Sequence, residues 1–451
     1  MRRDDHADDL LRAHAEGEYV FPDYGGYCFA GVPGTALSAL DAAPEDVPTL
    51  PGDVFAGVDT EGVENVVVLL VDGFGYDQWC RAEDTDYLET TLLGRLSERG
   101  TVTPLTACFP SETAAAVPTV HTGQYAAEHG QLGWWQYVPE IGARVQTLPY
   151  VTGEGEPVRQ VYPDAPAPSK TLYDADSLYD DVAPEVSTSL FEPSDISGAD
   201  EQTFSAGASR YVGSENAAQL AVQLRRTLEG SSGEKYCYAY FPQVDAASHR
   251  EGPHAAATDA QLEAVLGALR RELLERCSTR VAERTLVVVT ADHGHVDTEG
   301  ENVDIRGYGP IWDNLATGPD GNPIPPVGSS RQVQLHLQDE TVEAVRSALE
   351  RNFDCRTFTR EEYEERGLFG PVVGGESGGR GSGSGGDNRG GSESNGNAYE
   401  RHAPDLVCVH REKGMWDDDT SLNHVGKHGG LTRAEMLVPF AAARLSDLQG
   451  E

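Results

Sequence analysis

Four short, unbroken apolar runs constrain the fold of this chain more than any other feature of its sequence. They cover residues 65–71, 236–241, 285–290 and 405–409. A continuous run, rather than an alternation of apolar and polar residues, is typical of a strand that is covered on both faces of a sheet. Segments with helical periodicity lie around them, at 85–99, 114–129, 215–229, 258–276 and 340–351. Strands that alternate with helices predict an α/β fold with a parallel sheet.

The length of 451 residues fits one large domain with elaborations, or two domains. Residues 131–210, rich in Pro, Asp, Ser and Tyr, and residues 298–335 fit the strand–helix alternation poorly. We interpret both as cap insertions over one edge of the sheet. Residues 374–397 consist mostly of Gly and Ser. That composition cannot build a core, and it predicts a disordered linker loop.

The chain is strongly acidic, with a formal net charge of −40. Such a surface repels nucleic-acid backbones and anionic membranes, so we expect neither as a partner. It also repels phosphate, so a phosphate site would need local positive charge. Excess Asp and Glu with only four lysines favours the cytoplasm of a halophile, where salt screens charges within a few ångströms. An ordinary acidic protein is the alternative.

Cysteine usage and the N-terminus bear on location. The seven cysteines are scattered and form no CxxC pair, which argues against a disulfide framework and a thiolate zinc site. Residues 1–20 lack the apolar core of a signal peptide, and no apolar run approaches the length of a membrane helix. The sequence therefore predicts a soluble, cytoplasmic protein and is silent on its oligomeric state.

Three apolar runs end in, or close to, an aspartate: Asp72, Asp245 and Asp292. In open α/β sheets, ligands bind outside the carboxyl ends of the strands. His249 lies four residues after Asp245, and His293 directly follows Asp292. Carboxylate with neutral imidazole is a good ligand set for Zn²⁺, Mn²⁺ or Fe. Each pair alone could be a capped turn, but the three together favour a metal site.

Two further stretches carry candidate functional groups. Residues 109–123, FPSETAAAVPTVHTG, place Ser111 and Thr113 just before an alanine-rich helix. A hydroxyl there would lie at a helix N-terminus, which favours an anion, or would simply be an N-cap. His428 precedes two glycines in KHGGLTRAEMLVPF. Glycines at that place allow close approach of the backbone to a ligand or metal.

Five motifs in order carry a resemblance to a known family: VDGFG, FPSETAAAVPTVHTG followed by EHG, VDAASHREGP, ADHG and HGGLT. Together they resemble the alkaline phosphatase superfamily and, within it, the type I phosphodiesterase/nucleotide pyrophosphatase family. The resemblance spans about residues 64 to 440. It implies a single alkaline-phosphatase-like catalytic domain over 1–451, a three-layer α/β/α sandwich with a mostly parallel central sheet and cap insertions.

The resemblance also implies a site of two divalent metal ions, Zn²⁺ or alternatively Mn²⁺ or Fe. Six side chains would hold them: Asp72, Asp292 and His293 for one ion, and Asp245, His249 and His428 for the other. Thr113, the third residue of SET, matches the nucleophile of the family and would also touch the first ion. The implied reaction is hydrolysis of a small organic phosphoester through a phosphothreonine intermediate.

The sequence departs from the family after EHG, where an Asn that contacts phosphate is expected and Trp134 stands instead. This departure puts nucleotide pyrophosphates in doubt as substrates. Trp134 and Trp135, with Tyr137, could wall the pocket and stack on an organic group, or pack in the core. Arg331 and Lys427 are candidate phosphate contacts, or else exposed salt-bridge partners.

Several functions remain open from the sequence. A phosphodiesterase or nucleotide pyrophosphatase fits the motifs first, and a phosphomonoesterase or phosphonate hydrolase of the same superfamily is the alternative. The alternative from another class is a pseudoenzyme that binds metal without catalysis. A sulfatase is disfavoured because no C/S-x-P-x-R pattern occurs, and a phosphoglycerate mutase because the motif offers Thr113 rather than Ser.

Overall fold

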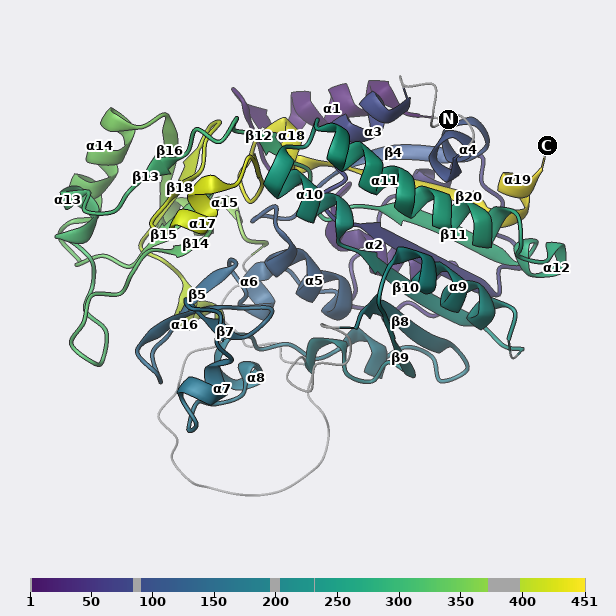
Figure 1. Ribbon diagram of the computed structural model, residues 1–451, viewed down its shortest axis with the longest axis horizontal. Coiled ribbons are helices and arrows are strands. Elements are labelled where there is room, and N and C mark those ends of the chain that lie inside the picture. The colour runs from purple at the N-terminus through teal and green to yellow at the C-terminus, as the bar shows by residue number, and fades with distance from the viewer. Residues whose placement is uncertain (1, 84–90, 195–202, 231, 372–397, 451) are drawn as a thin grey trace.

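The computed structural model describes residues 2–83, 91–194, 203–230, 232–371 and 398–450. The Gly/Ser linker predicted at 374–397 lies outside these described residues. The described residues form two seven-stranded sheets. Figure 1 shows these sheets at opposite ends of the molecule, with both chain termini beside the sheet on the right, which we call the large sheet.

The large sheet confirms the predicted α/β fold with a mostly parallel centre. Its strand order is β4-β20-β11-β3-β10-β8-β9, and β20 is antiparallel to both of its neighbours. Three of the predicted apolar runs form its buried middle, as β3, β10 and β11. The strands are β3 (Asn65–Val71), β4 (Thr101–Thr106), β8 (Ser187–Pro193), β9 (Arg210–Ser214), β10 (Lys235–Phe241), β11 (Thr285–Thr290) and β20 (Leu437–Arg444).

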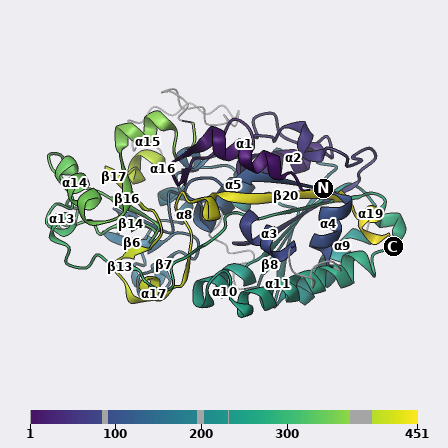
Figure 2. The same ribbon diagram turned by 90° about the horizontal axis from the view of Figure 1, so that it is seen from above.

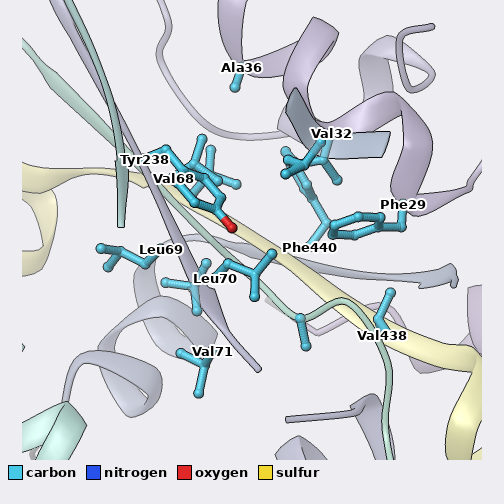
Figure 3. Close-up of a cluster of buried hydrophobic side chains, with 14 of the residues drawn as sticks. Phe29, Val32, Ala36, Val68, Leu69, Leu70, Val71, Tyr238, Val438 and Phe440 are labelled. Atoms are coloured by element: carbon cyan, nitrogen blue, oxygen red, sulfur yellow. The ribbon is translucent and has the colours of Figure 1, made fainter. Parts of the chain in front are cut away.

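Helices cover both faces of this sheet. Figure 2 shows α1 (Asp4–His14) and α2 (Val32–Ser38) on one side of β20, and α10 (Gln243–Glu251) and α11 (Ala256–Leu269) on the other. Figure 3 shows Phe29, Val32 and Ala36 beside side chains of β3 and β20. These side chains are almost completely buried, which is the dominant stabilising contribution to such a fold.

The predicted helices differ from the observed ones at their ends. The segment 114–129 is two helices, because Gly123 adopts a left-handed conformation (φ 68°) that ends the first of them. The described part of 85–99 is helical only from Leu92. The observed helices here are α3 (Tyr76–Glu83), α4 (Leu92–Arg99), α5 (Thr113–Thr122), α6 (Ala126–His129), α9 (Ala217–Leu228) and α14 (Val342–Asn352). A π-helical turn, Arg270–Leu274, extends α11.

The second sheet is antiparallel throughout, in the order β16-β17-β15-β14-β5-β6-β7. Assigning the apolar run 405–409 to the parallel sheet is therefore wrong, because this run forms β17 here. All residues of β17 are buried, so its apolar pattern looks the same as that of a strand in the parallel sheet. The strands are β5 (Trp135–Val138), β6 (Ala143–Gln146), β7 (Val151–Thr152), β14 (Val327–Gly328), β15 (Gln332–Leu335), β16 (Cys355–Thr359) and β17 (Leu406–His410).

The stretch 131–210 does not leave the large sheet over its whole length. Its first part supplies β5, β6 and β7 to the second sheet, but β8 pairs in parallel with β10 in the large sheet. The predicted end of this insertion at residue 210 is therefore wrong. The sequence analysis missed β8 because polar residues flank its short apolar pattern. Residues 298–335 contribute β14 and β15 to the second sheet.

Short elements complete the description. Three two-stranded pairs are β1 (Ala15–Glu16) with β2 (Tyr19–Val20), β12 (Val296–Asp297) with β19 (Gly426–Lys427), and β13 (Val303–Asp304) with β18 (Met415–Trp416). The short helices are α7 (Val158–Val161), α8 (Pro168–Thr171), α12 (Thr279–Ala282), α13 (Gly309–Trp312), α15 (Arg360–Arg366), α16 (Ala398–His402), α17 (Asp419–Asn423), α18 (Arg433–Met436) and α19 (Leu445–Gln449). Among the described residues, no helix is both long and apolar enough to cross a membrane.

Candidate metal centre

The carboxyl ends of three adjacent strands bring the three predicted aspartates together. Asp72 follows β3, Asp292 follows β11, and Asp245 lies in the first turn of α10, which begins two residues after β10. The backbone N–H of Asp245 donates to the carbonyl of Asp72 at 3.1 Å. Because β11, β3 and β10 are neighbours and parallel, their ends meet at one edge of the sheet.

One group of potential ligand atoms gathers around Asp245. Its Oδ1 lies 3.3 Å from His249 Nε2, 3.5 Å from His428 Nε2 and 3.0 Å from His295 Nε2. The Nε2 atoms of His249 and His428 are 3.1 Å apart. Ligands about 2.0–2.1 Å from a tetrahedral Zn²⁺ are separated by about 3.3–3.4 Å, so these spacings suit one cation.

A second group contains Asp72, Asp245 and His293, whose ligand atoms lie within 4.8 Å of one another. His293 Nε2 is 3.3 Å from Asp72 Oδ1 and 3.5 Å from Asp292 Oδ2. The Thr113 hydroxyl joins this group, 3.1 Å from His293 Nε2 and 3.4 Å from Asp72 Oδ1. The structure thus gathers all six predicted ligands and Thr113 at one place.

The histidines are oriented by backbone carbonyl groups. The Nδ1 atoms of the four rings face the carbonyl oxygens of Gly426 (His249), Gly294 (His293), Gly73 (His295) and Ser111 (His428) at 2.9–3.3 Å. A neutral ring whose Nδ1–H donates to such a carbonyl leaves Nε2 as a lone-pair acceptor. All four Nε2 atoms therefore present lone pairs to the cluster, which is the arrangement that a metal site needs.

Burial and mutual charge shift the ionisation of these groups. Burial lowers the pKa of His249, His293 and His428, which favours the neutral form that binds metal. Burial and the charges of Asp292 and Asp245 raise the pKa of Asp72 well above its ordinary value. Burial opposes ionisation of Asp245, but its histidine neighbours lower its pKa well below the usual range.

The residues present fit a pair of divalent cations. Asp292 Oδ1 accepts hydrogen bonds from the backbone N–H groups of Gly73 and His293, whereas its buried Oδ2 has no partner among the described residues. Buried carboxylates that repel one another, and imidazole lone pairs 3.1 Å apart, are unfavourable unless positive charge lies between them. This donor set accepts Zn²⁺, Mn²⁺ or Fe and does not distinguish among them.

The sequence analysis missed two members of the cluster. His295 is the second histidine of ADHGH, and its ring lies so close to Gly73 (φ 70°) that a Cβ there would be 2.3 Å from it. The hydroxyl of Tyr240, near the end of β10, donates to Asp72 Oδ2. A second His within four residues of Asp292 was a readable signal for His295, whereas nothing in an apolar run distinguished Tyr240.

A cavity of about 510 Å³ adjoins the cluster, between the carboxyl edge of the large sheet and the second sheet. Thr113, Asp245, His249 and His428 line one side of it. Trp134, Trp135, Arg144, Ser329 and Lys427 are among the residues that line the other. The two tryptophans are thus at the wall of the pocket, whereas Tyr137 is buried and does not line it.

The two predicted phosphate contacts differ. Lys427 lines the cavity, its side chain donates to the carbonyl of Ser421, and burial lowers its pKa to about 7. Arg331 does not line the cavity and is 0% exposed, so neither a phosphate contact nor an exposed salt bridge describes it. Its guanidinium binds Glu435 through Nε and Nη2, both at 2.8 Å. A lone Arg in GSSRQV carried no signal of this partner, which lies 104 residues away.

The family model described as "Type I phosphodiesterase / nucleotide pyrophosphatase" matches residues 66–431 of the chain. This match covers most of the described structure, from β3 to the HGG segment that carries His428. No curated protein sequence is significantly similar to the chain.

Solved structures with the same fold include murine ectonucleotide pyrophosphatase / phosphodiesterase 5, at 16% identity and a TM-score of 0.55, over 85% of this chain and 92% of that one. An inactive form of the murine protein was solved in complex with AMP. Phosphonoacetate hydrolase from Sinorhizobium meliloti 1021, in complex with phosphonoacetate, is 17% identical with a TM-score of 0.52, over 88% of this chain and 95% of that one. At these identities the likeness is one of fold.

Proposed function

The chain belongs to the type I phosphodiesterase / nucleotide pyrophosphatase family of phosphoric ester hydrolases, and on that premise we propose that it hydrolyses a small organic phosphodiester with Thr113 as the nucleophile. Asp72, Asp292 and His293 would hold one divalent metal ion, and Asp245, His249 and His428 the other. Zn²⁺ is the proposed metal, with Mn²⁺ and Fe as alternatives. The observation that carries this proposal is the Thr113 hydroxyl, which contacts both His293 and Asp72 at the first position of α5.

Thr113 occupies a place that suits a reacting phosphate. The N-terminus of α5 favours negative charge, because backbone N–H groups there lack intrahelical partners. Oγ of Thr113 would attack phosphorus, forming the Oγ–P bond while the bond to the leaving oxygen breaks, and water would then hydrolyse the phosphothreonine. The metal ions would stabilise the threonine alkoxide and the charge of the phosphoryl group. Tyr240 and the four carbonyl groups hold the ligand side chains in place.

The cavity supports a small organic group on the phosphoester. Its volume of about 510 Å³ is within the usual range for small-molecule sites. Trp134 and Trp135 offer apolar and aromatic surface for that group. The ligands of the fold relatives, AMP and phosphonoacetate, are small phosphorus compounds, which agrees with a substrate of this size.

The test compares the purified chain with Thr113→Ala in high salt. Metal content is measured together with hydrolysis of bis-p-nitrophenyl phosphate, p-nitrophenyl phosphate and a nucleotide p-nitrophenyl ester. We expect two metal ions per chain and a fall in diester turnover of at least about 10³-fold in the variant, since loss of a nucleophile has effects of that size or larger. Thr341→Ala, on the surface before α14, is the matched control and keeps wild-type turnover.

Other outcomes identify the alternatives. Faster turnover of the monoester than of the diester would favour a phosphomonoesterase. Cleavage of phosphonoacetate in place of esters would favour a phosphonate hydrolase. A chain that binds metal but cleaves none of these compounds, with Thr113→Ala behaving like wild type, would be a metal-binding pseudoenzyme.

The proposal also covers the domain organisation of the protein and its cellular location. We infer that residues 1–451 form a single catalytic domain, with the second sheet as an elaboration, and that it works in the cytoplasm of a halophile. The net charge of −40 supports the halophile hypothesis. The expected result is loss of fold and activity in salt-free buffer and recovery in molar salt. Full activity without salt would contradict it.

A further inference from the structure

His295 is a buried histidine of the cluster that the family resemblance assigns to neither ion. It lies between β11 and β12, and its side chain is 0% exposed. Its ring lies beside the rings of three predicted ligands, with centroids 5.3–5.6 Å from those of His249, His293 and His428. The fold thus places a fourth imidazole where the resemblance calls for three.

Gly73 makes room for this ring. It directly follows Asp72 with a left-handed backbone (φ 70°), and a Cβ there would be 2.3 Å from His295 Cε1 and 3.1 Å from Asp245 Cβ. The carbonyl oxygen of Gly73 faces His295 Nδ1 at 3.0 Å. This glycine therefore admits the ring, and its carbonyl orients the ring so that Nε2 faces Asp245.

An ordinary hydrogen bond does not account for Nε2. This atom lies 3.0 Å from Asp245 Oδ1. A neutral ring has one N–H, and when Nδ1 donates to the Gly73 carbonyl, Nε2 has a lone pair and cannot donate to a carboxylate. A doubly protonated ring could donate at both ends, but a divalent ion at Asp245 would repel its positive charge. A lone pair and a carboxylate oxygen at this distance are favourable when both bind the same cation.

The four donors around Asp245 form a complete set for one ion. The three Nε2 atoms and the carboxylate oxygen lie within 4.8 Å of one another. Four protein ligands fill the tetrahedral shell of a structural zinc ion, whereas catalytic zinc has three protein ligands and an open position. Asp245, His249 and His428 line the cavity, but His295 does not. His295 therefore approaches from the interior of the protein, where a substrate in the cavity cannot displace it.

The position at Asp72 has a different donor set. Its predicted ligands are two carboxylates and one imidazole, from Asp72, Asp292 and His293, and these three residues do not line the cavity. Thr113 does line it, and its hydroxyl is 3.1 Å from His293 Nε2. This position is thus completed by the group that would react. Carboxylate oxygens suit Mn²⁺, whereas imidazole nitrogens suit Zn²⁺.

We infer that His295 is the fourth protein ligand of the ion at Asp245, which makes the two ion positions unequal. The position at Asp245 is a filled site of three imidazoles and one carboxylate, selective for an ion that prefers nitrogen, such as Zn²⁺. The position at Asp72 is open at Thr113 and also accepts an ion that prefers oxygen, such as Mn²⁺. The inference rests on the proposed two-ion centre, but it does not depend on which ester is hydrolysed.

Cobalt substitution counts the ligands directly. The chelator-treated chain is titrated with Co²⁺ and followed by proton NMR, because the paramagnetic ion shifts the ring N–H signal of each coordinated histidine far outside its usual range. We expect three such signals from the first equivalent, for His249, His295 and His428, and one more from the second, for His293. The visible absorption of the first equivalent should be that of four-coordinate Co²⁺ and should not change when inorganic phosphate is added.

The difference in metal preference has its own test. The chelator-treated chain receives one equivalent of Zn²⁺ and then an excess of Mn²⁺, and the metal content is measured after gel filtration. We expect one Zn²⁺ and one Mn²⁺ per chain. Loss of the Zn²⁺ to Mn²⁺ would contradict a filled, nitrogen-rich site.

His295→Ala tests the residue itself. The first equivalent of Co²⁺ should then give two signals, phosphate should change the absorption because a position is open, and Zn²⁺ affinity should fall by at least about 10-fold. Thr113→Ala should alter the second equivalent only. His254→Ala, at an exposed histidine, is the matched control and should keep all three signals. The count in the wild type decides the question even if His295→Ala does not fold.

The outcomes separate this inference from the proposed function. Two signals from the first equivalent in the wild type would overturn the inference, because His295 would then be a hydrogen-bond partner of Asp245 rather than a ligand. Diester turnover that depends on Thr113 would leave the proposed function intact in that case. A chain that binds no Co²⁺ would overturn both.

Discussion

Two buried groups of charged side chains flank the segment that contains His428, and they differ in how their polar atoms are paired. One is the ion pair of Arg331 with Glu435, in which both side chains are 0% exposed. The other is the candidate metal cluster around Asp72, Asp245 and Asp292. Both place formal charges in the core, where unpaired charge is very costly.

The Arg331–Glu435 pair is complete in itself. Besides its two bonds to Glu435, the guanidinium donates to the carbonyls of Lys413 at 2.6 Å and Arg411 at 3.1 Å. Glu435 also accepts from the N–H groups of Gly430 and Thr432. Burial opposes its ionisation, yet the Arg331 charge lowers the pKa of Glu435. Nothing further is needed there, so this pair holds the HGG segment against β15 and α18.

In the candidate metal cluster, by contrast, the charged and polar atoms do not have a full set of partners. It contains acceptor atoms almost exclusively, and Asp292 Oδ2 has no partner among the described residues. Burial and two neighbouring carboxylates raise the pKa of Asp72. The comparison teaches that burial of charge does not itself mark a functional site. The distinguishing sign is a surplus of acceptors that only a cation, or a ligand, can satisfy.

The largest effect should follow from breaking the complete pair. Glu435→Ala leaves the Arg331 charge buried without a counter-ion, and we expect the free energy of unfolding to fall by about 3–5 kcal/mol. Urea unfolding followed by circular dichroism measures it. The double variant Arg331→Met with Glu435→Gln should recover part of this loss. If Glu435→Ala unfolds like wild type, the pair does not hold the segment.

A third buried group, the pair of His121 with Glu192, extends the comparison to the pH dependence of stability. Their Nε2 and Oε1 atoms are 3.9 Å apart, and burial lowers the pKa of His121 to about 3 and raises that of Glu192 to about 7. Both groups are thus mostly neutral near pH 7. Because the folded pKa of Glu192 lies above its ordinary value of 4.5, its contribution to stability is lost as pH rises from 4.5 through 7.

Glu192→Gln should remove this loss. At pH 8 we expect the variant to be more stable than wild type by about 2–3 kcal/mol, and at pH 5 the difference should nearly vanish. Urea unfolding across this pH range measures both. Glu215→Gln, at an exposed position before α9, is the control and should show no such dependence. A variant that is equally destabilised at both pH values would show that Glu192 is ionised in the fold.

His295→Ala should weaken metal binding without removing any of the six predicted ligands. Its Nε2 is 3.0 Å from Asp245 Oδ1 in one group of potential ligand atoms, so it can offer one more lone pair to the cation there. Loss of such a partner typically costs 10–100-fold in metal affinity. Competition with a chromogenic chelator measures the affinity, and His254→Ala, at an exposed histidine, is the control. Unchanged affinity would exclude His295 from the cluster.

The smallest expected effect is a gain in stability rather than a loss. Asp72→Asn removes one of the mutually repelling carboxylates, so the chelator-treated variant should unfold with a free energy about 1 kcal/mol higher than wild type treated alike. The same variant should lose the stabilisation that added Zn²⁺ gives the wild type. Asp8→Asn, on the exposed face of α1, should change neither quantity. Destabilisation of the chelated Asp72→Asn chain would contradict the proposed surplus of negative charge.

Much of the large sheet was predictable because its strands are buried on both faces. The runs that became β3, β10 and β11 needed no partner to be recognised, since continuous apolar residues of this length have few other uses. Strand ends also positioned the aspartates, because parallel strands share one carboxyl edge. His249 was predictable as a site residue because it lies four residues after Asp245. One turn of α10 brings two residues at this spacing close together.

The second sheet was not predictable by the same argument. Its strands come from segments scattered over residues 135–410, and its pairing depends on antiparallel partners that lie far apart in the chain. The run that became β17 carried the same signal as the parallel strands and was assigned to the wrong sheet.

The sequence by itself determined the chemistry of this protein: apolar strands that end in carboxylates, histidines at short spacings and a hydroxyl before a helix. These are local signals, set by neighbouring residues and by the periodicity of strands and helices. Only the tertiary structure decided which polar groups are satisfied. Arg331 became a structural ion pair because Glu435 lies 104 residues away in the chain but 2.8 Å away in space.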